Sequence, residues 1–178
     1  KHYYYFDVNK HILVNNLKPL SLLKIDHHIT QDTPILSDEI YEIVRSRLKQ
    51  INVKDFVIFH PSAQYKYKIY PRELRNKLLH SLSNLGISIL ITGSKNTIDM
   101  EIKKELSALP NIIDLIGETT LEEYFVLSSL SKAYIGMDTL NMHIAAGQNK
   151  PIFAIFGPTI LSMWSPWSNS KGQSATND

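Results

Sequence analysis

Short apolar runs alternate with helix-period segments along most of this chain, and that alternation is the feature that most restricts its fold. Within each run the apolar residues are mostly continuous and do not alternate with polar residues. Both faces of each predicted strand are therefore expected to be covered, as in a parallel sheet. We therefore predict an α/β fold with a doubly wound, mainly parallel, Rossmann-like sheet. The predicted strands occupy residues 56–59, 87–91, 112–116, 133–135 and 152–156.

Amphipathic segments between these runs predict helices. The first follows Ser37, a favourable N-cap residue succeeded by two acidic residues, and it carries apolar side chains at helical spacing. The second begins after Pro71 and stops at Gly86. Residues 1–36 lack such a pattern, and we expect them to be irregular. Further helices are expected near residues 98–106, 120–131 and 141–146.

Composition excludes several classes of protein. The 178 residues are 43% apolar and 20% charged, a composition that a disordered chain does not have. Without cysteine there is no disulfide, thiolate metal site or thiol nucleophile. The net charge of +2 is too small to indicate a nucleic-acid partner. No apolar run approaches the roughly 18 residues of a membrane span, and the length suits one domain.

The glycines suggest where a ligand would bind. Four of the 7 glycines follow predicted strands closely: Gly93, Gly117, Gly136 and Gly157. Ligands of open parallel sheets bind beyond the carboxyl ends of the strands, where glycine permits close approach and helix N-termini attract anions. The alternative is that these glycines only make tight turns. The G-x-G-x-x-G and G-x-x-x-x-G-K-[ST] patterns are both missing, so neither an NAD fingerprint nor a P-loop is present.

Two segments near the C-terminus together form a recognisable pattern. Residues 135–146 read IGMDTLNMHIAA and residues 150–159 read KPIFAIFGPT. They resemble the donor-site signature of the ADP-heptose:lipopolysaccharide heptosyltransferases, glycosyltransferase family 9, which is D-[ST]-G-x-x-H-x-A-A followed by P-x-x-x-x-F-G-P-T. The resemblance covers about residues 50–167. Four more segments resemble other parts of the family pattern: HPS at 60–62, KIYP at 68–71, GETTL at 117–121 and WSPW at 164–167.

The resemblance implies half of a two-domain, GT-B-type architecture. Members of that family have two Rossmann-like domains, of which the C-terminal one binds the nucleotide-sugar and the N-terminal one binds the acceptor and carries the acidic base. Residues 1–50 would then be an interdomain segment and the first helix, 51–167 the nucleotide-sugar-binding domain and 168–178 a polar tail. The chain begins at Lys1 rather than methionine, and we expect it to be part of a longer protein.

The activity implied is inverting transfer of heptose from ADP-heptose to the inner core of lipopolysaccharide. The expected ligand is ADP or ADP-heptose, with no cofactor or metal required, and a lipid-linked oligosaccharide would be the acceptor. Such an enzyme would be cytoplasmic and peripheral to the inner membrane. This chain alone would bind the donor without turnover. The alternatives are an enzyme using a UDP- or GDP-sugar, a non-catalytic nucleotide-sugar-binding module, and a scaffold that binds only protein.

Carried over residue by residue, the signature points to a phosphate end of the donor site. Lys68 matches the basic residue beside the donor phosphates, where an ammonium stabilises the leaving nucleotide; Lys66 competes for that role. Ser62 matches a hydroxyl near the same phosphates, or it caps a turn. Asp138 and Thr139 match the Asp-[Ser/Thr] pair, and either can instead N-cap the next helix.

Other positions match the signature less closely. Leu140 replaces the usual glycine and Asn141 replaces the commoner Leu or Pro, so these two positions leave donor geometry and identity open. Asn141 could bind a sugar hydroxyl or cap the helix. His143 matches the signature histidine, as a neutral hydrogen-bonding group or a structural residue. Asp99 corresponds to an acidic residue that contacts ribose, or it only complements a helix N-terminus.

The remaining candidates lie at the margins of the expected site. Thr119 falls where the family places residues beside the nucleobase, or it is a helix cap. Gly157 and Thr159 would close the floor of the site, or merely end the last strand. Trp164 and Trp167 are more readily interpreted as cover for the sheet edge than as stacking partners for a base or sugar.

Overall fold

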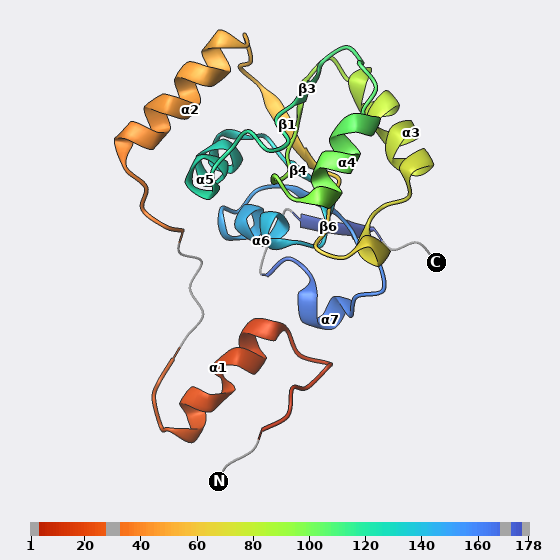
Figure 1. Cartoon of the computed structure of the whole chain (residues 1–178). Coiled ribbons are helices and arrows are strands. Elements are labelled where there is room, and N and C mark those ends of the chain that lie inside the picture. The colour runs from red at the N-terminus through yellow and green to blue at the C-terminus, as the bar shows by residue number, and fades with distance from the viewer. Residues whose placement is uncertain (1–3, 28–32, 168–171, 176–178) are drawn as a thin grey trace.

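The computed structural model describes residues 4–27, 33–167 and 172–175. These residues form one six-stranded parallel sheet with helices on both faces (Figure 1). The predicted doubly wound, Rossmann-like α/β fold is therefore confirmed. The strands are β1 (Phe56–His60), β2 (Ser88–Ile91), β3 (Ile112–Asp114), β4 (Tyr134–Met137), β5 (Ile152–Ile155) and β6 (Gly172–Ala175).

The order of the strands contains one reversal, and it positions the site. Across the sheet the order is β3-β2-β1-β4-β5-β6. From β1 the chain moves outward to β3, and it then crosses back to place β4 on the other side of β1. His60, which ends β1, lies opposite Gly136 of β4. Ligands of such sheets bind beyond the carboxyl ends of the strands at this kind of reversal.

The helices divide between the two faces of the sheet. One face is covered by α3 (Arg72–Ser83) and α4 (Thr97–Glu105), and the other by α2 (Asp38–Gln50), α5 (Leu121–Leu130) and α6 (Leu140–Gly147) (Figure 1). Each of these helices overlaps a segment predicted from the apolar period. The 3-10 turn η1 (Lys66–Lys68) and the short helix α7 (Leu161–Trp164) complete the domain.

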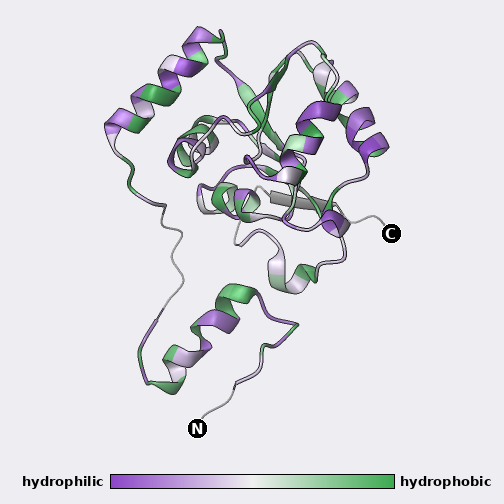
Figure 2. Ribbon diagram, in the orientation of Figure 1, coloured by the Kyte–Doolittle hydropathy of each residue, from purple (hydrophilic) through white to green (hydrophobic). Residues whose placement is uncertain are grey.

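Burial on both faces explains why the strand sequences are continuous apolar runs. Ile58 and Leu90 belong to the apolar cluster that includes α2, α5 and α6, whereas Phe59 and Ile91 pack with α3 and α4. All four side chains are fully buried. Because successive residues of a strand point to opposite faces, both sets of positions must be apolar. Figure 2 shows hydrophobic strands beside helices α3 and α4, which are largely hydrophilic.

Four elements fall outside the predicted helices and strands: the short η1 and α7, and two others. Helix α1 (Ile12–Leu22) lies in the segment expected to be irregular, and β6 lies in the segment set apart as a polar tail. Pro19 stands inside α1, and the buried side chain there is polar: the Asn15 amide donates to the Asp7 carbonyl at 3.0 Å. An apolar period therefore does not mark this helix. Strand β6 pairs with β5 through backbone groups, which needs no apolar sequence.

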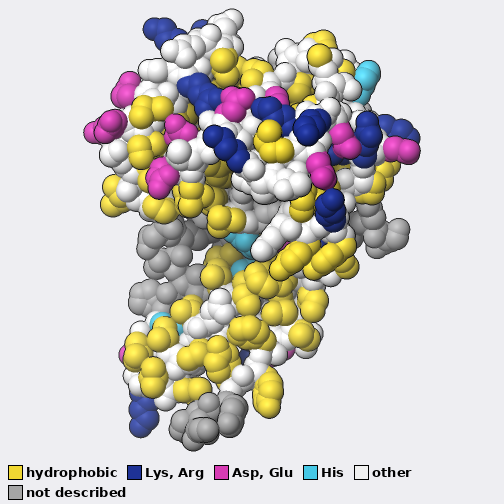
Figure 3. All heavy atoms as spheres, in the orientation of Figure 1, with side chains coloured by type: hydrophobic (Ala, Val, Ile, Leu, Met, Phe, Trp, Pro, Cys, Tyr) yellow, Lys and Arg dark blue, Asp and Glu magenta, His cyan; other side chains and the backbone are white. Residues whose placement is uncertain are grey.

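Exposed hydrophobic side chains gather over the N-terminal segment. They form the lower part of the surface in Figure 3, whereas acidic and basic side chains intermingle over the upper part. The exposed N-terminal side chains include Tyr5, Phe6, Leu22, Leu23 and Ile25.

Within the part of the chain that the structure describes, no helix is long and apolar enough to cross a membrane.

The contact between β1 and β4 depends on Gly136. A Cβ atom at this position would overlap the carbonyl oxygen of His60 and lie 2.9 Å from the Tyr134 hydroxyl. We expect Gly136→Ala to lower the free energy of unfolding by about 1–3 kcal/mol, as overpacking does. Urea denaturation measures this. Gly147→Ala is the matched control, because nothing lies within 4 Å of its added methyl group; equal losses in both variants would contradict the assignment.

Candidate functional site

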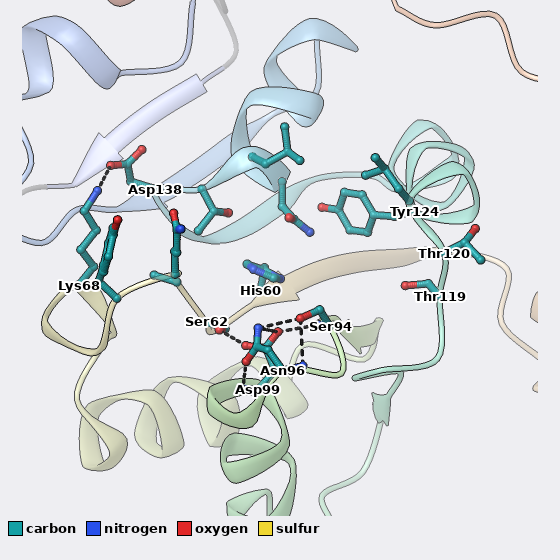
Figure 4. Close-up of a pocket in the computed structure, with 18 residues that line it drawn as sticks. His60, Ser62, Lys68, Ser94, Asn96, Asp99, Thr119, Thr120, Tyr124 and Asp138 are labelled. Carbon is teal, nitrogen blue, oxygen red and sulfur yellow. Dashed lines mark hydrogen bonds and ion pairs between the residues drawn. The ribbon is translucent and has the colours of Figure 1, made fainter.

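A cavity of about 470 Å³ opens at the carboxyl ends of the strands, at the reversal between β1 and β4 (Figure 4). The loops that follow β1, β2, β3 and β4 all contribute to its wall. This is the place that the strand and glycine pattern indicates for a ligand. Of the residues predicted from the sequence, those that line the cavity are Ser62, Lys68, Asp99, Thr119, Asp138, Thr139, Leu140 and Asn141.

An ion pair marks one end of the cavity. The Lys68 Nζ atom lies 3.6 Å from Oδ2 of Asp138, and the two side chains are 25% and 6% exposed. Lys66, the competing lysine, is 73% exposed, pairs with Glu101 at 3.3 Å and does not line the cavity. The structure therefore brings Lys68, not Lys66, to the wall of the cavity. A nearly buried carboxylate holds its ammonium at the wall.

Gly157 and Thr159 do not line the cavity, contrary to their expected place in its floor. A Cβ atom on Gly157 would lie 3.2 Å from the Cα atom of Lys68. Gly157 therefore provides the space in which the backbone of η1 packs. The Thr159 amide donates to the Gly157 carbonyl at 2.7 Å, and its buried hydroxyl has no hydrogen-bond partner among the described residues.

Asp99 organises the loop between β2 and α4. Its buried carboxylate accepts hydrogen bonds from the Ser62 hydroxyl, from the Ser94 amide at 2.5 Å and from the Asn96 side chain at 3.1 Å. Asn96 also N-caps α4 by accepting from the Asp99 amide at 2.8 Å. Asp99 was expected to contact ribose. In this structure its carboxylate oxygens are engaged in holding two cavity loops together.

The start of α6 forms another wall. Thr139 is the N-cap residue, but its side chain makes no capping bond, and its buried hydroxyl finds no partner within the described chain. The capping alternatives for Asp138 and Asn141 are likewise not realised, since the helix begins at Leu140. Leu140 does not adopt the left-handed conformation, so the leucine causes no backbone strain here. Its side chain is 59% exposed at the cavity.

His143, in the second turn of α6, does not line the cavity. Its Nε2 atom is 3.9 Å from Oδ1 of Asp138, and its ring centroid is 6.3 Å from that of Trp164. Burial lowers the pKa of His143, Asp138 opposes that effect, and His11 adds to it, so the neutral imidazole is favoured. Trp164 and Trp167 do not line the cavity; Trp167 packs on the His11 ring at 4.7 Å. Both tryptophans therefore contact histidines outside the cavity.

Sequence reasoning misses His60 and Tyr124 as site residues, although both line the cavity. Nδ1 of His60 lies 3.2 Å from Oγ1 of Thr92, and burial lowers its pKa to about 4 despite the nearby Asp99. The position of His60 at the end of a predicted strand was a usable signal. In the sequence, Tyr124 lies on the apolar face of the predicted helix, so nothing distinguishes it from a core residue of α5. That helix is capped by Thr120, not Thr119, through a reciprocal pair of bonds with Glu123.

The low pKa of His60 predicts acid sensitivity. The folded protein holds this imidazole neutral down to about pH 4, whereas an ordinary histidine gains its proton near 6.5. Stability is therefore lost as the pH falls through 6.5. We expect His60 to lower the free energy of unfolding by about 2 kcal/mol at pH 5 relative to pH 7. Urea denaturation of the wild type and His60→Gln at both pH values measures it, because the part due to His143 remains in the variant. Identical pH dependence in both proteins would contradict the assignment.

Fold and cavity together define the class: a Rossmann-like α/β domain with a ligand cavity at its strand reversal. The family model for glycosyltransferase family 9 (heptosyltransferase) matches residues 18–178, and the chain belongs to this family. Lipopolysaccharide heptosyltransferase 3 of Escherichia coli K12 is 28% identical over 165 residues, which cover 90% of this chain and 48% of that protein. The chain thus spans about half the length of the curated relatives it matches most fully.

Solved structures give the same fold. A family 9 glycosyltransferase from Veillonella parvula superposes with a TM-score of 0.83 at 16% identity, over 100% of this chain and 53% of that one. The Escherichia coli heptosyltransferase WaaC, solved with ADP, superposes with a TM-score of 0.67 at 17% identity, over 89% of this chain and 48% of that one. The sheet and its flanking helices therefore match GT-B heptosyltransferase domains.

Proposed function

We propose that this chain is the donor-binding, C-terminal part of an inverting glycosyltransferase that transfers heptose from ADP-heptose to the lipopolysaccharide inner core. The observation that carries the proposal is the Lys68 ammonium held at the cavity wall by Asp138, at the strand reversal of a family 9 chain. The ADP present in the WaaC structure supports the choice of adenine nucleotide.

The site is suited to a pyrophosphate between Lys68 and the N-terminus of α6. Lys68 is paired with the carboxylate of Asp138. A bound phosphate would compete for the same ammonium, which would offset part of the phosphate charge. The first turn of α6 lines the same cavity, and helix N-termini favour anions. As the glycosidic bond breaks, negative charge grows on the departing ADP, and these groups stabilise it. Asp138 aims the lysine and does not itself contact phosphate.

The acceptor half of the reaction is assigned to sequence beyond this chain. An acidic base there would deprotonate an acceptor hydroxyl, which attacks the anomeric carbon while ADP leaves. The lipid-linked acceptor would place the whole enzyme at the cytoplasmic side of the inner membrane. On this proposal the isolated chain binds the donor but does not turn it over. No step requires a metal ion, because Lys68 and the α6 N-terminus supply the positive charge.

Lys68→Ala should weaken ADP binding by about ten- to hundredfold. One charge-assisted contact contributes about 1.5–3 kcal/mol, which corresponds to that range of affinities. Isothermal titration calorimetry with ADP, UDP and GDP measures both the affinity and the nucleotide preference. Lys66→Ala is the matched control, because Lys66 lies two residues away and outside the cavity.

The outcomes separate the candidate functions. Preference for ADP that only Lys68→Ala weakens supports the proposal. Preference for UDP or GDP retains the glycosyltransferase and changes the donor. Failure of the folded wild-type chain to bind any nucleotide would overturn the site and favour a scaffold that binds only protein.

A further inference from the structure

The cavity has two chemically different ends. Lys68 and Asp138 lie at one side of Figure 4, and Thr119, Thr120 and Tyr124 lie at the other. The first end carries a cation, whereas the second presents uncharged hydroxyl groups. On the proposed function, the first end would hold phosphate. The uncharged end would then hold the nucleoside, whose hydroxyl and ring atoms are neutral hydrogen-bonding groups.

Tyr124 is the anomalous residue at the uncharged end. It is 4% exposed, and its ring reaches from α5 with the hydroxyl directed towards the cavity in Figure 4. That hydroxyl has no hydrogen-bond partner among the described residues. Burial raises the pKa of the Tyr124 hydroxyl, and the nearby Asn141 side chain opposes part of that rise. The two groups nevertheless do not have the geometry of a hydrogen bond. Buried hydroxyls are normally paired, so an unpaired one beside a cavity indicates that ligand binding completes its hydrogen bonding, here through a neighbouring side chain.

We propose that Tyr124 and Asn141 together recognise the nucleoside of the bound nucleotide. Asn141 lines the cavity and lies beside the Tyr124 hydroxyl, which is itself covered by protein atoms. When a nucleotide binds, the Asn141 amide turns to hydrogen-bond the nucleoside and the Tyr124 hydroxyl together. Tyr124 is thus a positioning residue that acts through Asn141, and in the complex its hydroxyl gains a hydrogen-bond partner that it does not have among the described residues.

A second buried tyrosine provides a matched comparison. Tyr134 is as deeply buried as Tyr124, but its hydroxyl donates to the Met137 carbonyl at 2.8 Å, and it does not line the cavity. Removing the Tyr134 hydroxyl therefore costs a hydrogen bond in the folded protein. Removing the Tyr124 hydroxyl breaks no hydrogen bond among the described residues. We therefore expect Tyr124→Phe to change nucleotide binding but not to lower stability, and Tyr134→Phe to lower stability but not to change nucleotide binding.

The test combines two ligands with these two variants. Tyr124→Phe should weaken ADP binding about three- to tenfold, the range for one neutral hydrogen bond, and leave the affinity for inorganic pyrophosphate unchanged. Its thermal midpoint without ligand should equal or exceed that of the wild type.

Tyr134→Phe should lower the thermal midpoint and leave the ADP affinity of the folded protein unchanged. Asn141→Ala should also weaken ADP and not pyrophosphate, and adding Tyr124→Phe to it should cause no further loss.

The inference rests on the proposed function, yet the two fail in different ways. Wild-type binding of ADP with no loss in Tyr124→Phe would overturn the inference and leave the proposed function intact. Equal weakening of ADP and pyrophosphate by Tyr124→Phe would also overturn it, because that result indicates general distortion of the cavity. Absence of nucleotide binding by the wild-type chain would overturn the proposed function, and the inference with it.

Discussion

The pairing of β1 with β4 is the contact on which the rest of the structure depends. It joins the two halves of the sheet, which the chain builds in opposite directions, and it sets His60 against a residue without a side chain. Because both strands end at the same edge, the loops after them diverge towards opposite faces. The cavity is the space between those loops. The residues that line the cavity thus converge through a contact between strands that are distant in the sequence.

The two buried acidic residues at the cavity hold parts of the site in place. Asp99 binds the loop after β1 to the loop after β2 through Ser62 and Ser94. Asp138 holds the ammonium of Lys68, whose backbone packs against Gly157. Hydrogen bonds thereby satisfy the carboxylate of Asp99 and an ammonium that of Asp138, as burial of polar groups requires. The positions of the lysine and of both loops are consequently fixed before any ligand binds, which reduces the ordering that binding must impose.

Much of the fold could be predicted because its signals are local. Strands buried on both faces must be continuous apolar runs, and the helices between them carry an apolar stripe, so both can be recognised without knowing their partners. The exceptions have physical reasons. Helix α1 is stabilised around a buried amide at Asn15, and β6 joins the sheet through its backbone. Neither kind of interaction leaves an apolar pattern in the sequence.

The sequence by itself determined the parallel α/β class, the edge of the sheet at which the cavity opens and the segments that surround it. Only the tertiary structure showed that Lys68 and not Lys66 lines the cavity, that Asp99 holds two loops together, and that Tyr124 lines the cavity as well. The physical reason is that periodicity records which positions are buried, whereas the partner of a polar side chain depends on residues brought near by strand order. A tyrosine with a paired hydroxyl and one without it look the same in a sequence.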